Sequence, residues 1–257
     1  SMKIAVLIKQ VPGTESKLSI NDKNKWINES TTTFVMNPPD SFALEEALLI
    51  KEKINSVEVV VVSMGPARSQ KVIREALARG ADRGIHIQEH DNFEKDPLSI
   101  GKVFASVLKN EKFDLIFTGL QSDDTGMGQT GILIGEILNM STATLVVETD
   151  CTESNIKVKR ELESGWFQWL TMPLPASVSI QSGLNIPRYP SLKGIMGAKK
   201  KKINTINYAE IVNSSQTQRI ESVSVPATSK QTEYIEGDSD EIASRLAAIL
   251  KKEIKVV

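Results

Sequence analysis

The chain has 257 residues, and its 31 basic and 32 acidic side chains leave a net charge of −1, which gives no case for nucleic acid or membrane lipid as a partner. Its single cysteine, Cys151, excludes an internal disulfide, and its two histidines lack metal-ligand spacing, so we expect no metal site. No apolar run approaches the roughly 20 residues of a membrane span. Residues 3–9 are too short and too charged for a signal-peptide core, so we expect a cytoplasmic protein that is not embedded in a membrane.

The first half of the chain alternates strands with helices. Apolar residues at helical spacing predict helices that start near residues 41, 67 and 97, and we expect Asp40 or Ser41 to cap the first of them. Continuous apolar runs predict buried strands at 4–8, 57–62, 84–87 and 115–118. This alternation predicts an α/β fold with a mainly parallel sheet and helices on both faces. Ligands of such sheets bind where the strands end, which here means residues 9–11, 63–65 and 118–121.

The pattern changes after residue 140. Four strands without helices between them indicate an antiparallel or mixed extension of the sheet; they are predicted at 143–148, 156–161, 166–170 and 176–180. Residues 204–237 show no periodicity and are rich in Ser, Thr and Asn, which is typical of an extended arm. A last helix is predicted from Asp238 to Lys251, with an apolar face that needs a surface to pack on, either its own domain or a partner. We therefore expect an α/β domain at 1–203 and a C-terminal arm at 204–257.

One loop between a strand and a helix suggests a ligand. Glycines and small polar residues from Gly119 to Gly131 lead into a helix that runs to about Leu138. A helix start offers unpaired N–H groups and the positive end of a dipole, and glycines let a backbone approach a ligand closely. The sequence therefore predicts a nucleotide phosphate site, and an ordinary helix start is the alternative. Asp123 and Asp124 would repel a phosphate unless they point away, cap the helix or hold a metal.

Other nucleotide and catalytic motifs fit less well. Gly126 to Gly131 has the letters of the dinucleotide fingerprint, but seven residues separate it from the strand and it lies in the fourth strand–helix unit, which argues against an NAD site. The chain has no P-loop and no Gly-x-Ser-x-Gly turn. His86 lies at the end of a predicted strand, which favours a structural residue over a base, and Cys151 has no evident activating partner, so no catalytic constellation is found. Residues 37–40, Asn-Pro-Pro-Asp, fit either a rigid turn or a contact to a base or ribose.

A second distinctive segment is residues 183–202. Leu192, Ile195 and Met196 lie there among glycines, prolines and lysines, where we expect no regular element to bury them. Flexible apolar side chains within a charged rim suit a partner-binding surface, and the four lysines at 199–202 could steer an acidic partner. An ordinary surface loop with solvated lysines is the alternative.

Several stretches resemble, in order, the beta subunit of electron transfer flavoprotein. The most specific are Arg-Glu-Ala-Leu-Ala-Arg-Gly-Ala-Asp-Arg at 74–83 and Pro-Arg-Tyr at 187–189, and the resemblance covers roughly residues 3–205. The other stretches are 36–47, 63–66, 84–86, 118–131, 158–161, 175–178 and 190–202.

The resemblance implies a non-enzymatic electron carrier. It implies a heterodimer in which the alpha subunit holds most of a redox-active FAD, while the beta subunit, of Rossmann-like nucleotide-binding fold, holds a structural AMP. In electron-bifurcating members a second FAD takes the place of AMP. Electrons would come from flavin dehydrogenases, such as acyl-CoA dehydrogenases, and pass by way of electron transfer flavoprotein-quinone oxidoreductase towards the quinone pool. The arm at 204–257 would pack on the alpha subunit.

The resemblance also implies positions for both sites. Leu192 would anchor a docking loop for the dehydrogenase at 183–202, together with Tyr189, Ile195 and Met196. The AMP site would comprise Leu7, Asn37, Pro38, Pro39, Asp40, Met64, Gly119, Gln121, Ser122, Asp124, Thr125, Gly126, Met127, Gly128, Gln129 and Thr130.

Two departures from the family pattern bear on these expectations. Residues 122–128 lack the Asp-Gly-Asp-Thr run of the bifurcating group, which favours AMP over a second FAD. Glu163-Ser164-Gly165 replaces an expected Asp-Gly-Gly. This change puts in doubt the subunit contact that the resemblance implies at the strands predicted at 156–161 and 166–170. A nucleotide-binding module without redox work, and an NAD-dependent enzyme, are the competing hypotheses.

Overall fold

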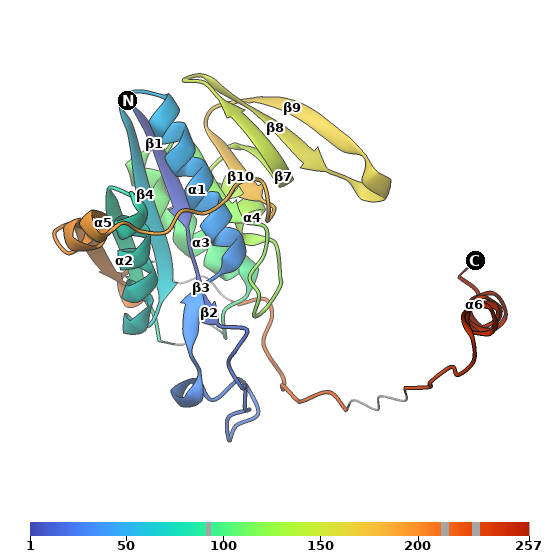
Figure 1. Cartoon of the computed structure of the whole chain (residues 1–257). Helices are drawn as coiled ribbons and strands as arrows, with labels where there is room; N and C mark the ends of the chain where they lie inside the picture. Colours follow the sequence, from blue (N-terminus) through green and yellow to red (C-terminus); the bar gives the residue numbers. More distant parts are fainter. Residues whose placement is uncertain (91–93, 212–215, 228–231, 257) are drawn as a thin grey trace. The chain divides into compact units, whose positions relative to one another are not determined.

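In the computed structural model, which describes residues 1–90, 94–211, 216–227 and 232–256, a nine-stranded sheet forms the centre of the molecule's first unit (Figure 1). The chain divides into two compact units, residues 1–223 and 224–257. The strands of the large sheet are β1 (Met2–Leu7), β4 (Val57–Gly65), β5 (Arg83–Gln88), β6 (Leu115–Gly119), β7 (Ser141–Cys151), β8 (Asn155–Glu161), β9 (Phe167–Pro173), β10 (Ala176–Ile180) and β11 (Ile203–Asn207). A separate antiparallel pair comprises β2 (Gln10–Pro12) and β3 (Phe34–Met36).

The sheet is mainly parallel, as the strand–helix alternation predicts. Its order is β11-β5-β4-β1-β6-β10-β7-β8-β9, and the strands from β11 to β7 run parallel. Only β8 and β9 are added antiparallel at the edge. The predicted strand at 176–180 belongs to the interior of the sheet, because β10 lies between β6 and β7. The α/β fold with extra antiparallel strands is therefore confirmed.

Helices cover both faces of the sheet. Alternate residues of β1 point to opposite sides, so that Ile4 and Val6 pack with α1 and α2 whereas Ala5 and Leu7 pack with α3 and α4. This double burial explains why the parallel strands are continuous apolar runs. The helices of this unit are α1 (Pro38–Lys53), α2 (Gln70–Arg79), α3 (Pro97–Leu108), α4 (Thr130–Ile137) and the short α5 (Leu192–Ala198).

The start of α1 differs from the prediction. The helix begins at Pro38, because a proline at the first position has a suitable φ and needs no hydrogen-bond partner for a missing N–H. Asp40 and Ser41 therefore lie inside the first turn and cap nothing. The Asp40 carboxylate instead accepts hydrogen bonds from the backbone N–H groups of Lys9, just after β1, and of Gly119, at the end of the neighbouring strand β6.

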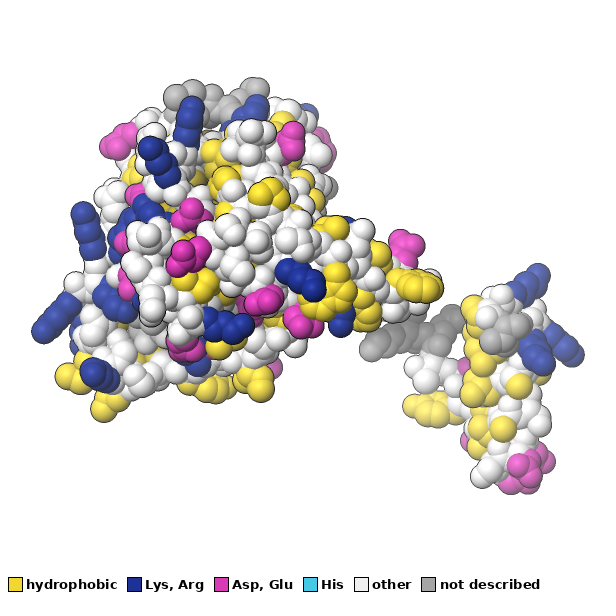
Figure 2. Space-filling model, turned by 90° about the horizontal axis from the view of Figure 1, so that it is seen from above, with side chains coloured by type: hydrophobic (Ala, Val, Ile, Leu, Met, Phe, Trp, Pro, Cys, Tyr) yellow, Lys and Arg dark blue, Asp and Glu magenta, His cyan; other side chains and the backbone are white. Residues whose placement is uncertain are grey.

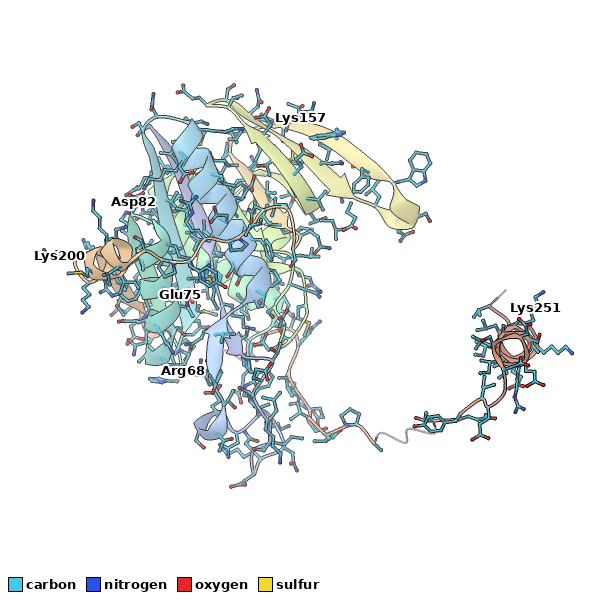
Figure 3. The ribbon with its side chains drawn as sticks, viewed as in Figure 1. Arg68, Glu75, Asp82, Lys157, Lys200 and Lys251 are labelled. Atoms are coloured by element: carbon cyan, nitrogen blue, oxygen red, sulfur yellow. The ribbon has the colours of Figure 1, made fainter. Side chains whose placement is uncertain are left out.

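The antiparallel hairpin of β8 and β9 forms an apolar edge of the sheet. Figure 2 shows hydrophobic side chains gathered at its projecting end, where Trp166 is 72% exposed and Phe167 and Trp169 are also exposed. Lys157, labelled on β8 in Figure 3, lies over the Trp169 ring at 4.8 Å from its centroid. These aromatic rings are only partly covered by the lysine side chains.

The segment between β1 and α1 folds against the start of α2. Arg68, labelled in Figure 3, stacks on the Phe34 ring at 3.5 Å and pairs with Glu29 at 3.1 Å. Its guanidinium also donates to the Gln10 side chain at 2.6 Å. Short 3₁₀ turns complete the unit, at Glu29–Thr31, Ala67–Ser69, Lys109–Glu111, Glu163–Gly165 and Tyr208–Glu210.

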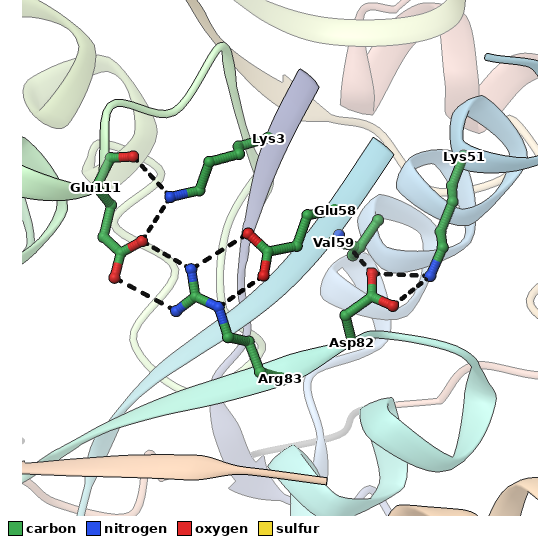
Figure 4. A network of polar contacts seen from close by, with 7 residues as sticks. All are labelled: Lys3, Lys51, Glu58, Val59, Asp82, Arg83 and Glu111. Atoms are coloured by element: carbon green, nitrogen blue, oxygen red, sulfur yellow. Dashed lines mark hydrogen bonds and ion pairs between the residues drawn. The ribbon is translucent and has the colours of Figure 1, made fainter. Parts of the chain in front are cut away.

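Ion pairs join the amino ends of the parallel strands (Figure 4). Arg83 at the start of β5 contacts Glu58 at 2.8 Å and Glu111 at 2.7 Å, and Lys3 of β1 contacts Glu111 at 2.7 Å. Hydrogen bonds from Arg83 and Lys3 lower the pKa of Glu111 to about 2. This network ties together the edge opposite the strand ends where a ligand is expected.

The predicted arm begins differently in the structure. Residues 203–207 form the edge strand β11, and the division between the units falls between Val223 and Ser224 rather than at 203/204. Residues 212–215 and 228–231 of the predicted arm lie outside the described residues. The second unit contains α6 (Ser239–Ala248), which Asp238 caps through a capping box with Glu241, and a π-helical turn at Ile249–Ile254. No described helix is long and apolar enough to cross a membrane.

Candidate functional site

A cavity of about 210 Å³ lies where three neighbouring parallel strands end. Leu7 of β1, Met64 of β4 and Gly119 of β6 line it, and these strands pair side by side in the centre of the sheet. The carboxyl edge of a parallel sheet is where ligands of this fold class bind. The cavity therefore lies at the edge that the sequence indicated.

The structure brings most of the predicted nucleotide residues together around this cavity. They come from the ends of β1, β4 and β6, the first turn of α1 and the loop before α4. The predicted residues that line the cavity are Leu7, Asn37, Asp40, Met64, Gly119, Gln121, Ser122, Thr125, Met127, Gly128, Gln129 and Thr130. Pro38, Pro39, Asp124 and Gly126 do not line it.

Asn37 fixes the loop that follows β6. Its side-chain amide donates to the Gln121 carbonyl at 2.9 Å, and its Oδ1 accepts from the Asp123 N–H at 3.0 Å. Asn37 is 1% exposed, so both bonds form away from bulk water. This residue therefore holds the start of α1 against the loop, whatever else it contacts.

Asp40 and Gly119 contact each other so closely that only glycine fits at position 119. A Cβ there would meet the Asp40 carboxylate and the Pro39 side chain. Burial raises the pKa of Asp40 to about 7, although hydrogen bonds from Lys9, Asn37 and Gly119 act in the opposite direction. Pro39 therefore packs against Gly119 and does not line the cavity.

The loop before α4 presents backbone to the cavity. Gly126 and Gly128 adopt left-handed conformations, with φ of 62° and 65°, which glycine accommodates without strain. Helix α4 begins at Thr130, and the preceding Gln129 makes no side-chain hydrogen bond to the first turn. The N–H groups of this turn are therefore available to an anion.

The two acidic residues of this loop do not prevent anion binding. Asp124 pairs with Lys9 at 2.8 Å and accepts the Thr125 N–H at 2.7 Å. Burial raises the pKa of Asp124, but Lys9 and these hydrogen bonds outweigh it, so that the pKa lies below its ordinary value. Asp123 is exposed, and its backbone N–H is bound to Asn37. One carboxylate is therefore neutralised, and the other faces solvent.

A buried hydroxyl on the cavity wall lacks a partner. Thr118 lines the cavity at the end of β6, and its Oγ1 has no hydrogen-bond partner within the described residues. The protein itself covers this atom, which lies against Gly131 in the first turn of α4, so the hydroxyl does not face a ligand in the cavity. The uncapped first turn of α4, rather than Thr118, is the feature of this wall that fits a polar ligand such as a nucleotide.

Several residues that line the cavity were not predicted from the sequence. Asp96, Pro97, Ile100 and Phe104 come from α3, which the sequence predicted as a helix but not as part of a site. The Asp-Pro pair at 96–97 is a helix-start signal, and only its place in the fold relates it to the cavity. The remaining missed residues are Ile8, Glu94, Lys95, Gln218, Arg219 and Ile220, whereas Lys9, Thr118 and Leu120 lie at the strand ends where a ligand was expected.

The predicted docking residues lie on a separate, exposed surface. Tyr189 is 92% exposed and Leu192 is 75% exposed, and Ile195 and Met196 are exposed on α5, so the apolar residues are unburied as expected. Leu192, Ile195 and Met196 occupy the short helix α5, where the sequence indicated no regular element. Ser191 caps this helix by accepting the Gly194 N–H, and Tyr189 precedes it. None of them lines the cavity.

The comparisons with known proteins agree with one another. The model of the electron transfer flavoprotein domain matches residues 25–211. The chain is 34% identical to electron transfer flavoprotein subunit beta of Methylophilus methylotrophus, over 98% of each chain. It is 35% identical to the human protein of that name over 82% of this chain and 83% of the relative, and 31% identical to that of Bacillus subtilis over 100% of both.

The chain belongs to the electron transfer flavoprotein beta-subunit family. This membership gives it an electron-transfer role rather than a catalytic one. The matched region, 25–211, contains α1, the loop before α4 and the segment 183–202. Strands β1 and β2 precede it, and the cavity-lining residues 218–220 follow it.

Proposed function

We propose that this chain is the beta subunit of a heterodimeric electron transfer flavoprotein and that its cavity holds a structural AMP. The observation that carries the proposal is the cavity at the ends of β1, β4 and β6, with the open first turn of α4 on its wall. The N–H groups of this turn would bind the phosphate.

The size and chemistry of the cavity favour AMP over a second FAD. Its volume of about 210 Å³ lies below the roughly 300–1,000 Å³ of typical ligand sites, so it leaves least room for a dinucleotide such as FAD. Apolar side chains on one part of the wall, including Met64 and Phe104, suit a base. The loop also lacks the Asp-Gly-Asp-Thr run that the resemblance associates with bifurcating members.

The redox-active FAD would be held mostly by an alpha subunit. The apolar β8–β9 hairpin and the C-terminal helix are surfaces that suit such a partner, because exposed aromatic and aliphatic residues are typical of interface cores. Glu163-Ser164-Gly165 forms the turn of this hairpin, so the departure from the family pattern falls at the tip of that surface. Flavin dehydrogenases, such as acyl-CoA dehydrogenases, would dock at Leu192, and electrons would leave by way of electron transfer flavoprotein-quinone oxidoreductase towards the quinone pool. Cytoplasmic location stays a prediction.

Nucleotide analysis of the purified protein tests the cofactor proposal. The chain is produced together with its candidate alpha subunit, the complex is denatured, and the released nucleotides are identified by chromatography and mass spectrometry. We expect FAD and AMP in equal amounts. FAD alone at twice the amount of the complex would contradict the AMP site and support the bifurcating alternative.

The same preparation separates the other hypotheses. A nucleotide-binding module without redox work would give a homo-oligomer with no flavin-bearing partner. An NAD-dependent enzyme would release a nicotinamide nucleotide. Neither outcome agrees with a beta subunit that holds AMP.

A further inference from the structure

Residues 217–223 form a segment without helix or strand (Figure 1), and we call this segment the strap. Gln218, Arg219 and Ile220 line the cavity together with Pro97 and Ile100 of α3. Most strap residues are exposed, whereas Ile220 is half-buried. The strap therefore separates part of the cavity from solvent.

One carboxylate holds the first end of the strap. Oδ2 of Asp96 accepts hydrogen bonds from the Thr217 N–H, from the Thr217 hydroxyl at 2.9 Å and from the Gln218 N–H at 2.9 Å. Oδ1 of the same group accepts the Ser99 N–H at 2.7 Å and so caps α3. Asp96 thus binds the strap to the helix that forms the cavity wall.

The other end of the strap is held by the loop before β3. The Lys25 ammonium donates to the Ile220 carbonyl at 3.3 Å and also to the Glu221 carbonyl, and the Val223 N–H donates to the Asn24 carbonyl at 2.8 Å. Both ends are therefore fixed by hydrogen bonds, with the cavity-lining residues between them.

The few contacts of the strap allow it to detach while the rest of the chain stays folded. It has no helix or strand structure, and its side chains add no fully buried residue to either hydrophobic core. Segments with few buried apolar contacts open locally at low free-energy cost. The bonds to Asp96 are charge-assisted, and these are stronger than bonds between neutral groups.

The charge on Asp96 persists at neutral pH. Burial raises the pKa of this group, but the hydrogen bonds from Ser99, Thr217 and Gln218 outweigh burial and hold the pKa well below its ordinary value. The carboxylate therefore stays available as an acceptor under ordinary conditions.

We infer that the strap retains the ligand in the cavity and that Asp96 is the positioning residue that holds it closed, a role that rests on the nucleotide function proposed above. A nucleotide would then leave only when the bonds between Asp96 and the strap break. Strap opening would set the release rate.

Two variants remove these bonds to different extents. Asp96→Ser keeps a good cap for α3, because serine is a preferred N-cap residue, but a single hydroxyl cannot accept all three strap bonds. Thr217→Val removes only the hydroxyl bond. Asp238→Ser is the matched control, because it makes the same change at the N-cap of α6.

The first measurement needs no nucleotide. Amide hydrogen exchange at Thr217 and Gln218, and trypsin cleavage after Arg219, are followed in the full chain. We expect both to be at least tenfold faster in Asp96→Ser, smaller increases in Thr217→Val, and no change in Asp238→Ser. Equal rates in all four chains would overturn the role of Asp96.

The second measurement follows release of radiolabelled AMP from the loaded full chain into excess unlabelled AMP. We expect release at least tenfold faster in Asp96→Ser, intermediate in Thr217→Val and unchanged in Asp238→Ser. If the wild-type chain binds AMP but all variants release it at the wild-type rate, the strap inference is wrong and the AMP proposal stands. A wild-type chain that binds no AMP would instead overturn the proposed cofactor, and the strap's role in retaining it.

Discussion

At the scale of single residues, Asp40 connects three segments of the cavity. It lies in the first turn of α1, and its two oxygens accept N–H groups from the end of β1 and the end of β6. Its raised pKa has a consequence for stability, because the folded chain binds a proton at this site more readily than the unfolded chain does. Between the ordinary value of 3.8 and about 7, the unfolding free energy must therefore fall as pH rises.

The variant Asp40→Asn should remove this pH dependence. Asparagine is neutral throughout, so the wild-type chain should lose roughly 2–4 kcal/mol of stability relative to the variant between pH 4 and pH 8. At low pH the wild type should be the more stable, because asparagine offers only one acceptor oxygen to the two N–H groups. Urea unfolding at several pH values, without added nucleotide, measures both effects.

Asp123→Asn supplies the control for this experiment. Asp123 is an exposed carboxyl of the same site, so its removal should leave the pH profile parallel to that of the wild type. A parallel profile for Asp40→Asn as well would show that burial of Asp40 does not govern the pH dependence.

At the scale of elements, α1 joins the cavity to the docking surface. Asn37 precedes its first residue and Asp40 lies in its first turn, and one to two turns later Glu45 pairs with Arg188 at 2.9 Å. Arg188 also pairs with Glu52 at 2.5 Å, and Asn185 donates to Glu46 at 2.9 Å. The segment leading to Leu192 is therefore held on a rigid helix, which lowers the ordering cost of binding a partner.

Leu192→Ala should slow electron transfer from a dehydrogenase while leaving the fold and any bound nucleotide intact. An exposed aliphatic anchor contributes to binding and little to folding, so we expect the transfer rate at low dehydrogenase concentration to fall at least tenfold. Stopped-flow flavin reduction of the heterodimer measures this rate.

Ile186→Ala is the matched control for the docking prediction, because Ile186 is an exposed aliphatic residue of the same loop outside the predicted anchor set. It should transfer electrons at nearly the wild-type rate. Equal rates for wild type and Leu192→Ala would remove Leu192 from the anchor role.

How far the sequence predicts these elements depends on how each is stabilised. β1, β4 and β6 are recognisable because burial on both faces demands continuous apolar runs. β11, with sequence Ile-Asn-Thr-Ile-Asn, is a partly exposed edge strand and lacks that signal. The loop before α4 was predictable because its glycines and helix start have local causes, whereas the strap was not, since a distant carboxylate places it.

At the scale of the whole molecule, the two units differ in how they are stabilised. Both hydrophobic cores consist of residues between 2 and 211, all in the first unit. The described residues of the second unit include none that is buried, although α6 has an apolar stripe containing Ile242 and Leu246. An isolated helix of this length is marginal in water, so it needs a partner surface.

A chain that ends at Val223 should therefore fold but associate poorly. We expect its unfolding midpoint in urea to match that of the full chain, because the cores are complete without the second unit. Affinity for the alpha subunit should fall at least tenfold, measured by calorimetry or by co-purification at graded concentrations. A truncated chain that binds the alpha subunit with full affinity would show that the arm does not contact it.

The aromatic edge of the sheet affects how this protein can be produced. β9 has the sequence Phe-Gln-Trp-Leu-Thr-Met-Pro and contains no charged side chain. In the described sheet it pairs with β8, and its other edge is open. Natural edge strands are usually protected by lysines, bulges or prolines, since open backbone groups recruit further strands. Only Pro173 at the end of β9 serves that purpose here. Copies made in excess of their partner should therefore aggregate edge to edge, and balanced co-expression should be what keeps the protein in solution.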